Sequence, residues 1–356
     1  MQAVRVLQSF GAPRPTTNPY IVMLGEALEH TPGIDLVRFS WRAALIGRYH
    51  VLHLHWPETL LGGSTPWRSR GKQAAFLVAL LRARLTGKAI VRTVHNLDLP
   101  LDVDRFQRWL LLRVEAWTTY RVTISAATQL APGTPASTVL HGHYRTWFEP
   151  FPRAEVVPGR LAFVGLIRRY KGIEALLRAF RETRDAPTAL TLGISGNPSS
   201  AELAAEITHA TDEDDRISAD LRFLDNADFV RAVTQAELVV LPYRFMHNSG
   251  SLLAALSLDR PVLAPANEAN AELSREVGLG WLHVYEGELS AGDLVRAVED
   301  LRTGPPARPP DLSAREWDTV GPRHLAAYRA ALATRRPRRR VGGAGGRSVL
   351  DHAGPA

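Results

Sequence analysis

The sequence contains no cysteine and no long hydrophobic run. Without cysteine it can form no disulfide, no thiolate nucleophile and no cysteine-ligated zinc site, so thiol-dependent catalysis and thiol redox chemistry are excluded. No apolar stretch approaches the roughly 18 residues of a membrane-spanning helix, which predicts a protein that does not cross a bilayer. The opening MQAVRVLQSF lacks a basic leader before an apolar core, and it favours a first strand and a cytoplasmic location over a signal peptide.

Charge is distributed unevenly along the chain. Residues 1–150 hold 17 Lys/Arg against 9 Asp/Glu, residues 151–333 hold 20 against 26, and residues 334–356 hold 6 against 1. A basic first half beside an acidic second half predicts an anionic partner for the first half alone, such as a phospholipid surface or a lipid phosphate. We expect no nucleic acid partner, because no recognisable nucleic-acid-binding motif accompanies the charge. The tail from residue 334 is also glycine-rich, and it is predicted to be disordered.

Short apolar runs rich in β-branched residues alternate with helical patterns along most of the chain. Six strands are predicted in the first half, from AVRVLQSF to STVLHG, and six in the second, from RLAFVGLI to GWLHVY. This alternation is typical of parallel sheets with crossover helices, and 356 residues suffice for two domains of ordinary size. The sequence therefore predicts an α/β protein with two doubly wound domains that face each other across a cleft.

The boundary between the domains is placed in PFPRAEVVPG, which combines three prolines with a glycine. We expect one domain over residues 1–150 and a second over residues 151–312. A helical segment over residues 313–333 should cross back to the first domain. Gly321-Pro322 should bend or break that helix, because proline removes a backbone donor.

The strongest local signal for a ligand site is FVGLIRRYKGIEALLRAF. A strand ends at Gly165, a basic loop with Arg168 and Lys171 follows, and a helix begins after Gly172. Cations and free backbone N–H groups at the carboxyl end of a parallel strand suit a diphosphate. The alternative is a solvated basic turn without a ligand.

This segment resembles the donor motif of retaining GT-B glycosyltransferases of the family-4 type, in which a Gly-Arg pair and a Lys-Gly pair hold the diphosphate of a nucleotide sugar. The resemblance implies that Lys171 binds the diphosphate. The motif places its arginine directly after the glycine, but Leu166 follows Gly165 here. The nearest arginine, Arg168, is therefore the candidate for that role. The resemblance also implies two Rossmann-like domains, an acceptor side in the first and a nucleotide-sugar site in the second, and no metal cofactor.

A second segment, ELVVLPYRFMHNSGSLLAALSLDRPVLAP, begins a helix at Ser249, Gly250 and Ser251. The free N–H groups of that helix start suit a phosphate, and the alternative is a serine cap without a ligand. The resembled family carries a Glu-x7-Glu pair here. Met246 and Ala254 occupy the two positions. With its Ser-Gly helix start after Leu-Pro-Tyr-Arg, the segment is similar to a divergent bacterial polysaccharide branch of that family.

The resemblance further implies that Tyr243, Arg244 and Glu272 lie near the donor sugar or ribose. Tyr243 and Arg244 follow the strand of the second segment, and Glu272 belongs to NEANAEL with Glu268. The alternative for the two glutamates is that first-turn carboxylates stabilise the helix dipole.

Two loops of the first half are expected to shape the acceptor site. The loop GAPRPTTNPY contains Asn18 and Tyr20, and Asn18 also suits a helix N-cap. The segment HLHWPETL contains His55 and, just past its strand, Trp56 and Glu58. An aromatic ring beside a carboxylate is a common sugar-binding pair. The histidines of this strand are alternatively explained as buried hydrogen-bonding residues, and no third ligand completes a metal site.

His95 is the candidate catalytic residue. It ends the strand AIVRTVH before a polar loop, and histidine suits proton transfer near neutral pH. GT-B enzymes often keep a histidine at a comparable strand end, where it contacts the donor sugar or assists proton transfer. His141 and His143 are alternatives.

The helix predicted between Pro66 and Lys88 combines basic ends with an apolar middle. This composition favours a helix lying on an anionic membrane, and the alternative is a packed helix with a basic flank. With the basic first half, it predicts a peripheral position on the inner face of the plasma membrane.

Together these features predict a hexosyltransferase for cell-surface glycan assembly. It would move mannose or glucose from a GDP- or UDP-linked donor to a lipid-linked or polysaccharide acceptor. Two alternatives stay open. One is an inverting GT-B transferase with Glu58, Asp98 or His95 as base, and the other is a noncatalytic protein that binds sugar nucleotides or polysaccharide.

Overall fold

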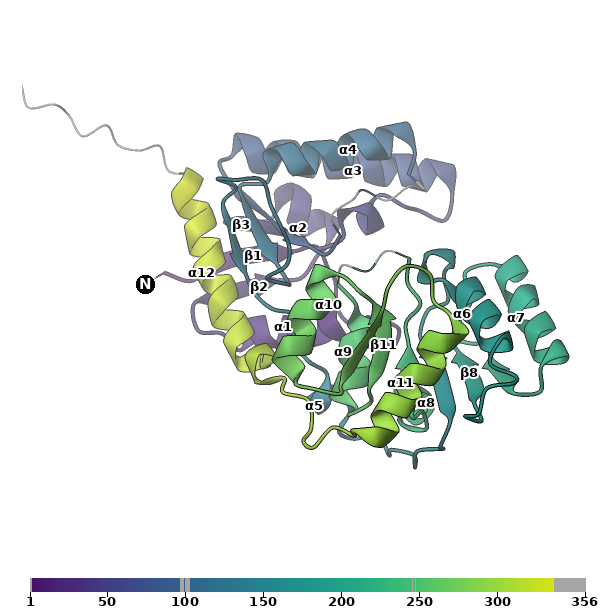
Figure 1. Cartoon of the computed structure of the whole chain (residues 1–356). Coiled ribbons are helices and arrows are strands. Elements are labelled where there is room, and N and C mark those ends of the chain that lie inside the picture. Colours follow the sequence, from purple (N-terminus) through teal and green to yellow (C-terminus); the bar gives the residue numbers. More distant parts are fainter. Residues whose placement is uncertain (1, 97–98, 100–102, 245, 247, 336–356) are drawn as a thin grey trace, which may run out of the picture.

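The computed structural model describes residues 2–96, 99, 103–244, 246 and 248–335, and it contains two six-stranded sheets (Figure 1). The first sheet has the order β2-β1-β3-β4-β5-β6 and the second β12-β11-β10-β7-β8-β9. Neighbouring strands are parallel in both sheets. The predicted α/β class with two doubly wound sheets of six strands each is confirmed.

The first sheet is built from residues 4–138. Its strands are β1 (Val4–Gln8), β2 (Ile34–Val37), β3 (Val51–Leu54), β4 (Ala89–Val94), β5 (Tyr120–Thr123) and β6 (Ala136–Thr138). The helical elements between and after these strands are α1 (Pro19–Glu29), α2 (Trp41–Ile46), η1 (Pro57–Leu60), α3 (Pro66–Leu85), α4 (Arg105–Trp117) and α5 (Arg145–Phe148).

The second sheet is built from residues 160–285. Its strands are β7 (Arg160–Val164), β8 (Thr191–Ser195), β9 (Ile217–Asp220), β10 (Leu238–Val240), β11 (Val262–Pro265) and β12 (Leu282–Tyr285). Its helical elements are η2 (Arg169–Lys171), α6 (Ile173–Arg181), α7 (Ala201–Glu213), α8 (Asn226–Thr234), α9 (Gly250–Ser257), α10 (Glu268–Val277) and α11 (Ala291–Thr303). The chain ends its described part with η3 (Ser313–Arg315) and α12 (Trp317–Arg335).

The central strands are buried on both faces, as expected for parallel sheets covered by helices. All four residues of β3 are buried, and so are five of the six residues of β4. Polar side chains begin the helices: the Asn18 side chain accepts from the Tyr20 amide, and the Ser249 side chain accepts from the Leu252 amide. Such caps satisfy amides that the first helical turn leaves unpaired. In the described part of the chain, no helix is both long and apolar enough to span a membrane.

The last helix, α12, follows the second sheet in sequence but lies against α1, β4 and β5 of the first half (Figure 1). Gly321-Pro322 was expected to bend or break this helix. The break does not occur, because α12 is continuous from Trp317 to Arg335 with Pro322 inside. Pro322 falls in the second turn, where it removes one hydrogen bond, and packing against α1 holds the helix together. The helix ends two residues beyond the predicted boundary at residue 333, and the rest of the predicted tail lies outside the described residues.

Candidate functional site

The two halves of the chain meet at the ends of their strands. The Asn248 side chain donates to the backbone oxygen of His95 over 3.3 Å. A pocket between the halves is lined by Ser125 and His141 from the first and by Ser249 and Asn270, among others, from the second. Open α/β sheets bind ligands at the carboxyl ends of their strands, so this junction is where a shared site is expected.

On the second half, Lys171 and the start of α9 converge. A β-carbon placed on Gly165 would have the Ser251 hydroxyl oxygen 3.5 Å away and the Lys171 Nζ 3.9 Å away. The two predicted diphosphate-binding elements therefore lie within 4 Å of a single point, and glycine leaves that point unfilled. Gly250 and Ser251 form the first turn of α9, where backbone N–H groups are free to bind an anion.

Lys171 is unusual for a lysine because its side chain is buried. Its residue is only 8% exposed, and its Nζ lies 5.1 Å from the centre of the Tyr243 ring, a cation–π contact. No described carboxylate forms an ion pair with it. A buried ammonium is costly unless an anion accompanies it, so the site is prepared for a negatively charged ligand.

The other predicted donor residues are placed less centrally. Arg168 and Arg244 are exposed beside the loop, and Arg168 forms no ion pair with a described residue. Tyr243 is buried under Lys171 and orients that side chain. Glu272 is half-buried on α10 and does not line the pocket between the halves, while Glu268 accepts from Gln129 across the junction over 3.1 Å.

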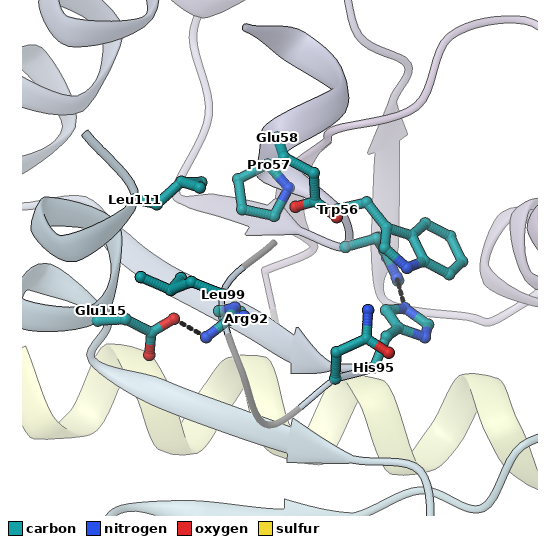
Figure 2. A pocket seen from close by; sticks show the side chains of 10 residues that line it. Trp56, Pro57, Glu58, Arg92, His95, Leu99, Leu111 and Glu115 are labelled. Atoms are coloured by element: carbon teal, nitrogen blue, oxygen red, sulfur yellow. Dashed lines mark hydrogen bonds and ion pairs between the residues drawn. The ribbon is translucent and has the colours of Figure 1, made fainter. Parts of the chain in front are cut away.

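On the first half, His55, Trp56, Glu58 and His95 line one pocket together (Figure 2). The Trp56 ring stacks on the His95 ring, with 3.8 Å between centroids. Burial raises the pKa of Glu58, and the charge of Arg92 opposes that rise. The sequence thus identified four residues that the fold brings together, although Trp56 is stacked on His95 rather than standing free.

Asn18 and Tyr20 belong to the start of α1. The Asn18 side chain caps the helix over 3.0 Å, which is the structural alternative that the sequence left open. Tyr20 is 3% exposed and packs 4.3 Å from the ring of His141 and 5.6 Å from that of His95. Their contact with an acceptor stays a prediction.

His95 directly follows β4 and is 7% exposed. Burial, and then neighbouring imidazoles, hold its pKa well below the ordinary value, so the ring is neutral and one of its nitrogens is unprotonated. Of the alternatives, His141 lies 3.4 Å from the Tyr144 hydroxyl, with a pKa lowered by burial to about 4. His143 instead lies 3.1 Å from Glu316. The rival base Asp98 lies outside the described residues.

Several residues at the junction were not predicted. Asn248 ties the α9 loop to His95, and the Tyr144 hydroxyl lies 3.3 Å from the place of a β-carbon on Gly250. Gln8 contacts His55, and Tyr328 contacts His53. Asn248 could have been predicted from the sequence, because it is a polar residue directly before the Ser-Gly helix start. No local sequence pattern marks Tyr144, Gln8 or Tyr328.

Comparison with known proteins places the chain in a family. The family described as Glycosyl transferases group 1 matches residues 158–303. The GDP-mannose:glycolipid 4-beta-D-mannosyltransferase of Xanthomonas campestris pv. campestris is 43% identical over 332 residues, which cover 92% of this chain and 93% of that protein.

Solved structures show the same fold at low sequence identity. HepE of Anabaena in complex with UDP aligns with a TM-score of 0.57 and 10% identity, over 94% of this chain and 98% of that one. The catalytic domain of starch synthase IV from Arabidopsis thaliana, bound to ADP and acarbose, aligns with a TM-score of 0.63 and 9% identity, over 93% and 99%. The identity to the Xanthomonas enzyme along nearly the whole chain, with these two facing sheets, shows that the chain belongs to the group 1 glycosyl transferases and is a GT-B glycosyltransferase.

Proposed function

We propose that this enzyme transfers a mannosyl group from GDP-mannose to a glycolipid. The activity named for the 43% identical relative supports this choice. The pocket of the first half and the convergence of Lys171 with the start of α9 in the second half also support it. The observation that carries the proposal is the buried Lys171 ammonium, unpaired among the described residues and directed to the same point as Ser251. That point is where we place the donor diphosphate.

The leaving diphosphate gains negative charge as the bond to the sugar breaks. Lys171 and the free amides of Gly250 and Ser251 would stabilise that charge, and they are held in place before the reaction begins. Arg168 is an exposed cation that can add a second contact. We expect these groups to act without a metal cofactor.

We further propose an inverting reaction, one of the alternatives that the sequence left open. The name of the relative specifies a β-mannosyl product, whereas the mannose of GDP-mannose is α-linked to phosphate. A β product requires the acceptor hydroxyl to attack C1 from the face opposite the diphosphate. A base must then take the hydroxyl proton, and His95 suits this role because it is neutral and bonded to the α9 loop through Asn248.

The acceptor implies a membrane, and we propose that α3 and α4 dock on its anionic inner face. Helix α3 carries five Lys/Arg and no Asp/Glu, and it exposes Trp67 at 81% and Leu85 at 82%. Helix α4 exposes Phe106 and Trp109, whose rings stack at 5.6 Å. The two helices contact each other and form one surface (Figure 1), which we call the docking face. Exposed apolar side chains among cations suit an anionic lipid surface.

The donor is tested with purified enzyme and a glycolipid extract. We expect GDP-mannose, and not UDP-glucose, to raise the thermal unfolding temperature and to release its nucleoside diphosphate when glycolipid is added. The anomeric configuration of the product, read from its one-bond C1–H1 coupling, should be β. Nucleotide release from UDP-glucose alone would overturn the choice of donor, and an α product would overturn the inverting reaction.

A further inference from the structure

A continuous chain of hydrogen bonds leads from α12 to His95. Tyr328 of α12 is fully buried, and the Gln8 side-chain amide donates to its hydroxyl over 3.0 Å. The Gln8 oxygen lies 3.1 Å from His55 Nε2, and His55 Nδ1 lies 3.3 Å from His95 Nε2. His95, at the end of this chain of bonds, lines the first-half pocket beside Trp56 (Figure 2).

The Gln8 amide gives this chain of bonds a direction. Its oxygen can only accept, so His55 Nε2 carries a proton and donates it. Burial lowers the pKa of His55 to about 3, so the ring is neutral and its Nδ1 is an acceptor. His95 Nε2 must then donate to His55 Nδ1. Since His95 is neutral as well, its Nδ1 has a free lone pair, and no described residue bonds to it.

The same direction holds on the other side of Gln8. The Tyr328 oxygen accepts from Gln8, so its O–H donates to His53 Nδ1 over 2.8 Å. His53 Nε2 then carries the proton and donates to the Thr93 hydroxyl over 2.8 Å. Each of these histidines is thereby held in a single tautomer.

If the Gln8 amide turned over, every bond of the chain would reverse. Its NH₂ would donate to His55 Nε2, His55 Nδ1 would donate to His95 Nε2, and the remaining proton of His95 would sit on Nδ1. A protonated Nδ1 cannot take a proton from the acceptor sugar. The orientation of one buried amide thus selects between a base and a hydrogen-bond donor at the cleft.

We propose that Gln8, anchored by Tyr328, is a positioning residue that holds His95 in the Nε2–H tautomer, with Nδ1 as the atom that accepts the proton of the acceptor hydroxyl. In the reaction the acceptor oxygen bonds to C1 and the bond from C1 to the diphosphate oxygen breaks. The electron pair leaves with GDP, and the hydroxyl proton passes to His95 Nδ1. This inference rests on the proposed role of His95 as base.

Nitrogen-15 NMR of histidine-labelled enzyme tests the tautomer directly, with the His95 signals assigned by their loss in His95→Asn. In the unaltered enzyme we expect a protonated Nε2 and an unprotonated Nδ1. Gln8→Met keeps the size of the side chain but removes both bonds, and it should give a mixture of His95 tautomers. A proton found on Nδ1 in the unaltered enzyme, or an unchanged tautomer in Gln8→Met, overturns the inference.

Kinetics then link the tautomer to turnover. Gln8→Met should lower kcat about 10-fold or more, with KM for GDP-mannose nearly unchanged, because general base catalysis contributes about 10²–10⁴-fold. Gln8→Glu should restore the His95 tautomer and most of kcat, since a carboxylate still accepts from His55 Nε2 and also from Tyr328. Tyr328→Phe should give an intermediate loss, because Gln8 loses its anchor.

Thr123→Val is the matched control, since it removes a buried hydroxyl bonded to Thr138 on a neighbouring strand and should change neither tautomer nor kcat. If the tautomer shifts in Gln8→Met while kcat holds, His95 is not the base, and the catalytic part of the inference fails while mannosyl transfer itself stands. If GDP-mannose is not a donor at all, the NMR result still decides the positioning role.

Discussion

Lys171 occupies its site because two glycines let the backbone approach closely. Gly172 has a φ of +70°, and a β-carbon there would lie 2.0 Å from the backbone oxygen of Pro242. Gly165 has a φ of +125° and leaves open the space between Lys171 and Ser251. A side chain at either position would be strained. At Gly172 it would clash with the backbone of Pro242, and at Gly165 it would fill the site. The cation is therefore held by its neighbours and pairs with no carboxylate among the residues that the structure describes.

Removal of the Lys171 ammonium should slow the reaction. Lys171→Ala should lower kcat/KM for GDP-mannose by about 10²–10³-fold, since it removes a charged donor to the leaving diphosphate. Lys171→Arg should keep part of the activity. Steady-state kinetics measure both.

Arg178→Ala is the control for Lys171, because Arg178 is an exposed cation on α6 that pairs with Glu288. It should change kcat/KM less than about two-fold. Equal donor affinity and rate in Lys171→Ala and the unaltered enzyme would contradict the placement of the diphosphate.

Among the elements, the strands and the return of α12 to the first half were predictable from the sequence, and the continuity of α12 was not. Parallel strands and their crossover helices follow from local patterns of apolar residues, so the sequence predicts eleven of the twelve strands in place. The remaining prediction, DLRFL, shares only Asp220 with β9, which covers Ile217–Asp220. The continuity of α12 through Pro322 depends on its contact with α1, which no local pattern contains. The site residues differ in the same way. Lys171 and Ser251 could be predicted because they belong to short motifs. Gln8 and Tyr328 could not, because they are 320 residues apart in sequence and meet only through the packing of α12.

Gly321 shows how closely α12 packs, and it gives a test of stability. A β-carbon on Gly321 would lie 1.8 Å from the Thr31 hydroxyl and 2.7 Å from the backbone oxygen of Ala27 on α1. Gly321→Ala should therefore lower the free energy of unfolding by about 1–3 kcal/mol, as overpacking does. Denaturant titration followed by circular dichroism measures this change.

Gly71→Ala is the matched control, because its β-carbon would meet nothing within 4 Å in α3. It should raise the free energy of unfolding by about 0.5–1 kcal/mol through helix propensity. Equal effects of the two substitutions would contradict the close contact between α12 and α1.

In the whole molecule, the two halves differ both in net charge and in the surface or site that they carry. The basic first half carries the docking face, and the acidic second half carries Lys171 and α9. An acidic second half is repelled by an anionic surface, whereas the first half is attracted. On the proposed anionic surface, these charges would orient the enzyme with α3 and α4 toward the lipid and would keep the second half away from it.

The docking face predicts binding to anionic vesicles. The double variant Trp67→Ala/Leu85→Ala should weaken binding to phosphatidylglycerol vesicles by about 10–100-fold, from the lost burial of apolar surface in the lipid. Flotation at increasing lipid concentration measures this, and vesicles of phosphatidylcholine, which is zwitterionic and has no net charge, should bind the enzyme poorly.

Leu279→Ala removes a side chain that is 94% exposed in the second half, and it should leave vesicle binding unchanged. The orientation on the membrane would be refuted if Leu279→Ala weakened binding as much as the double variant, or if binding were equal on charged and uncharged vesicles.

The return of α12 to the first sheet also constrains the order in which the protein matures during synthesis. When the ribosome has made β1 to β6, Gln8 and His53 still lack Tyr328, which follows more than 180 residues later. The second sheet is complete before α12 emerges. A nascent chain can therefore form its second sheet first, while the interior of the first half is completed only when α12 leaves the exit tunnel.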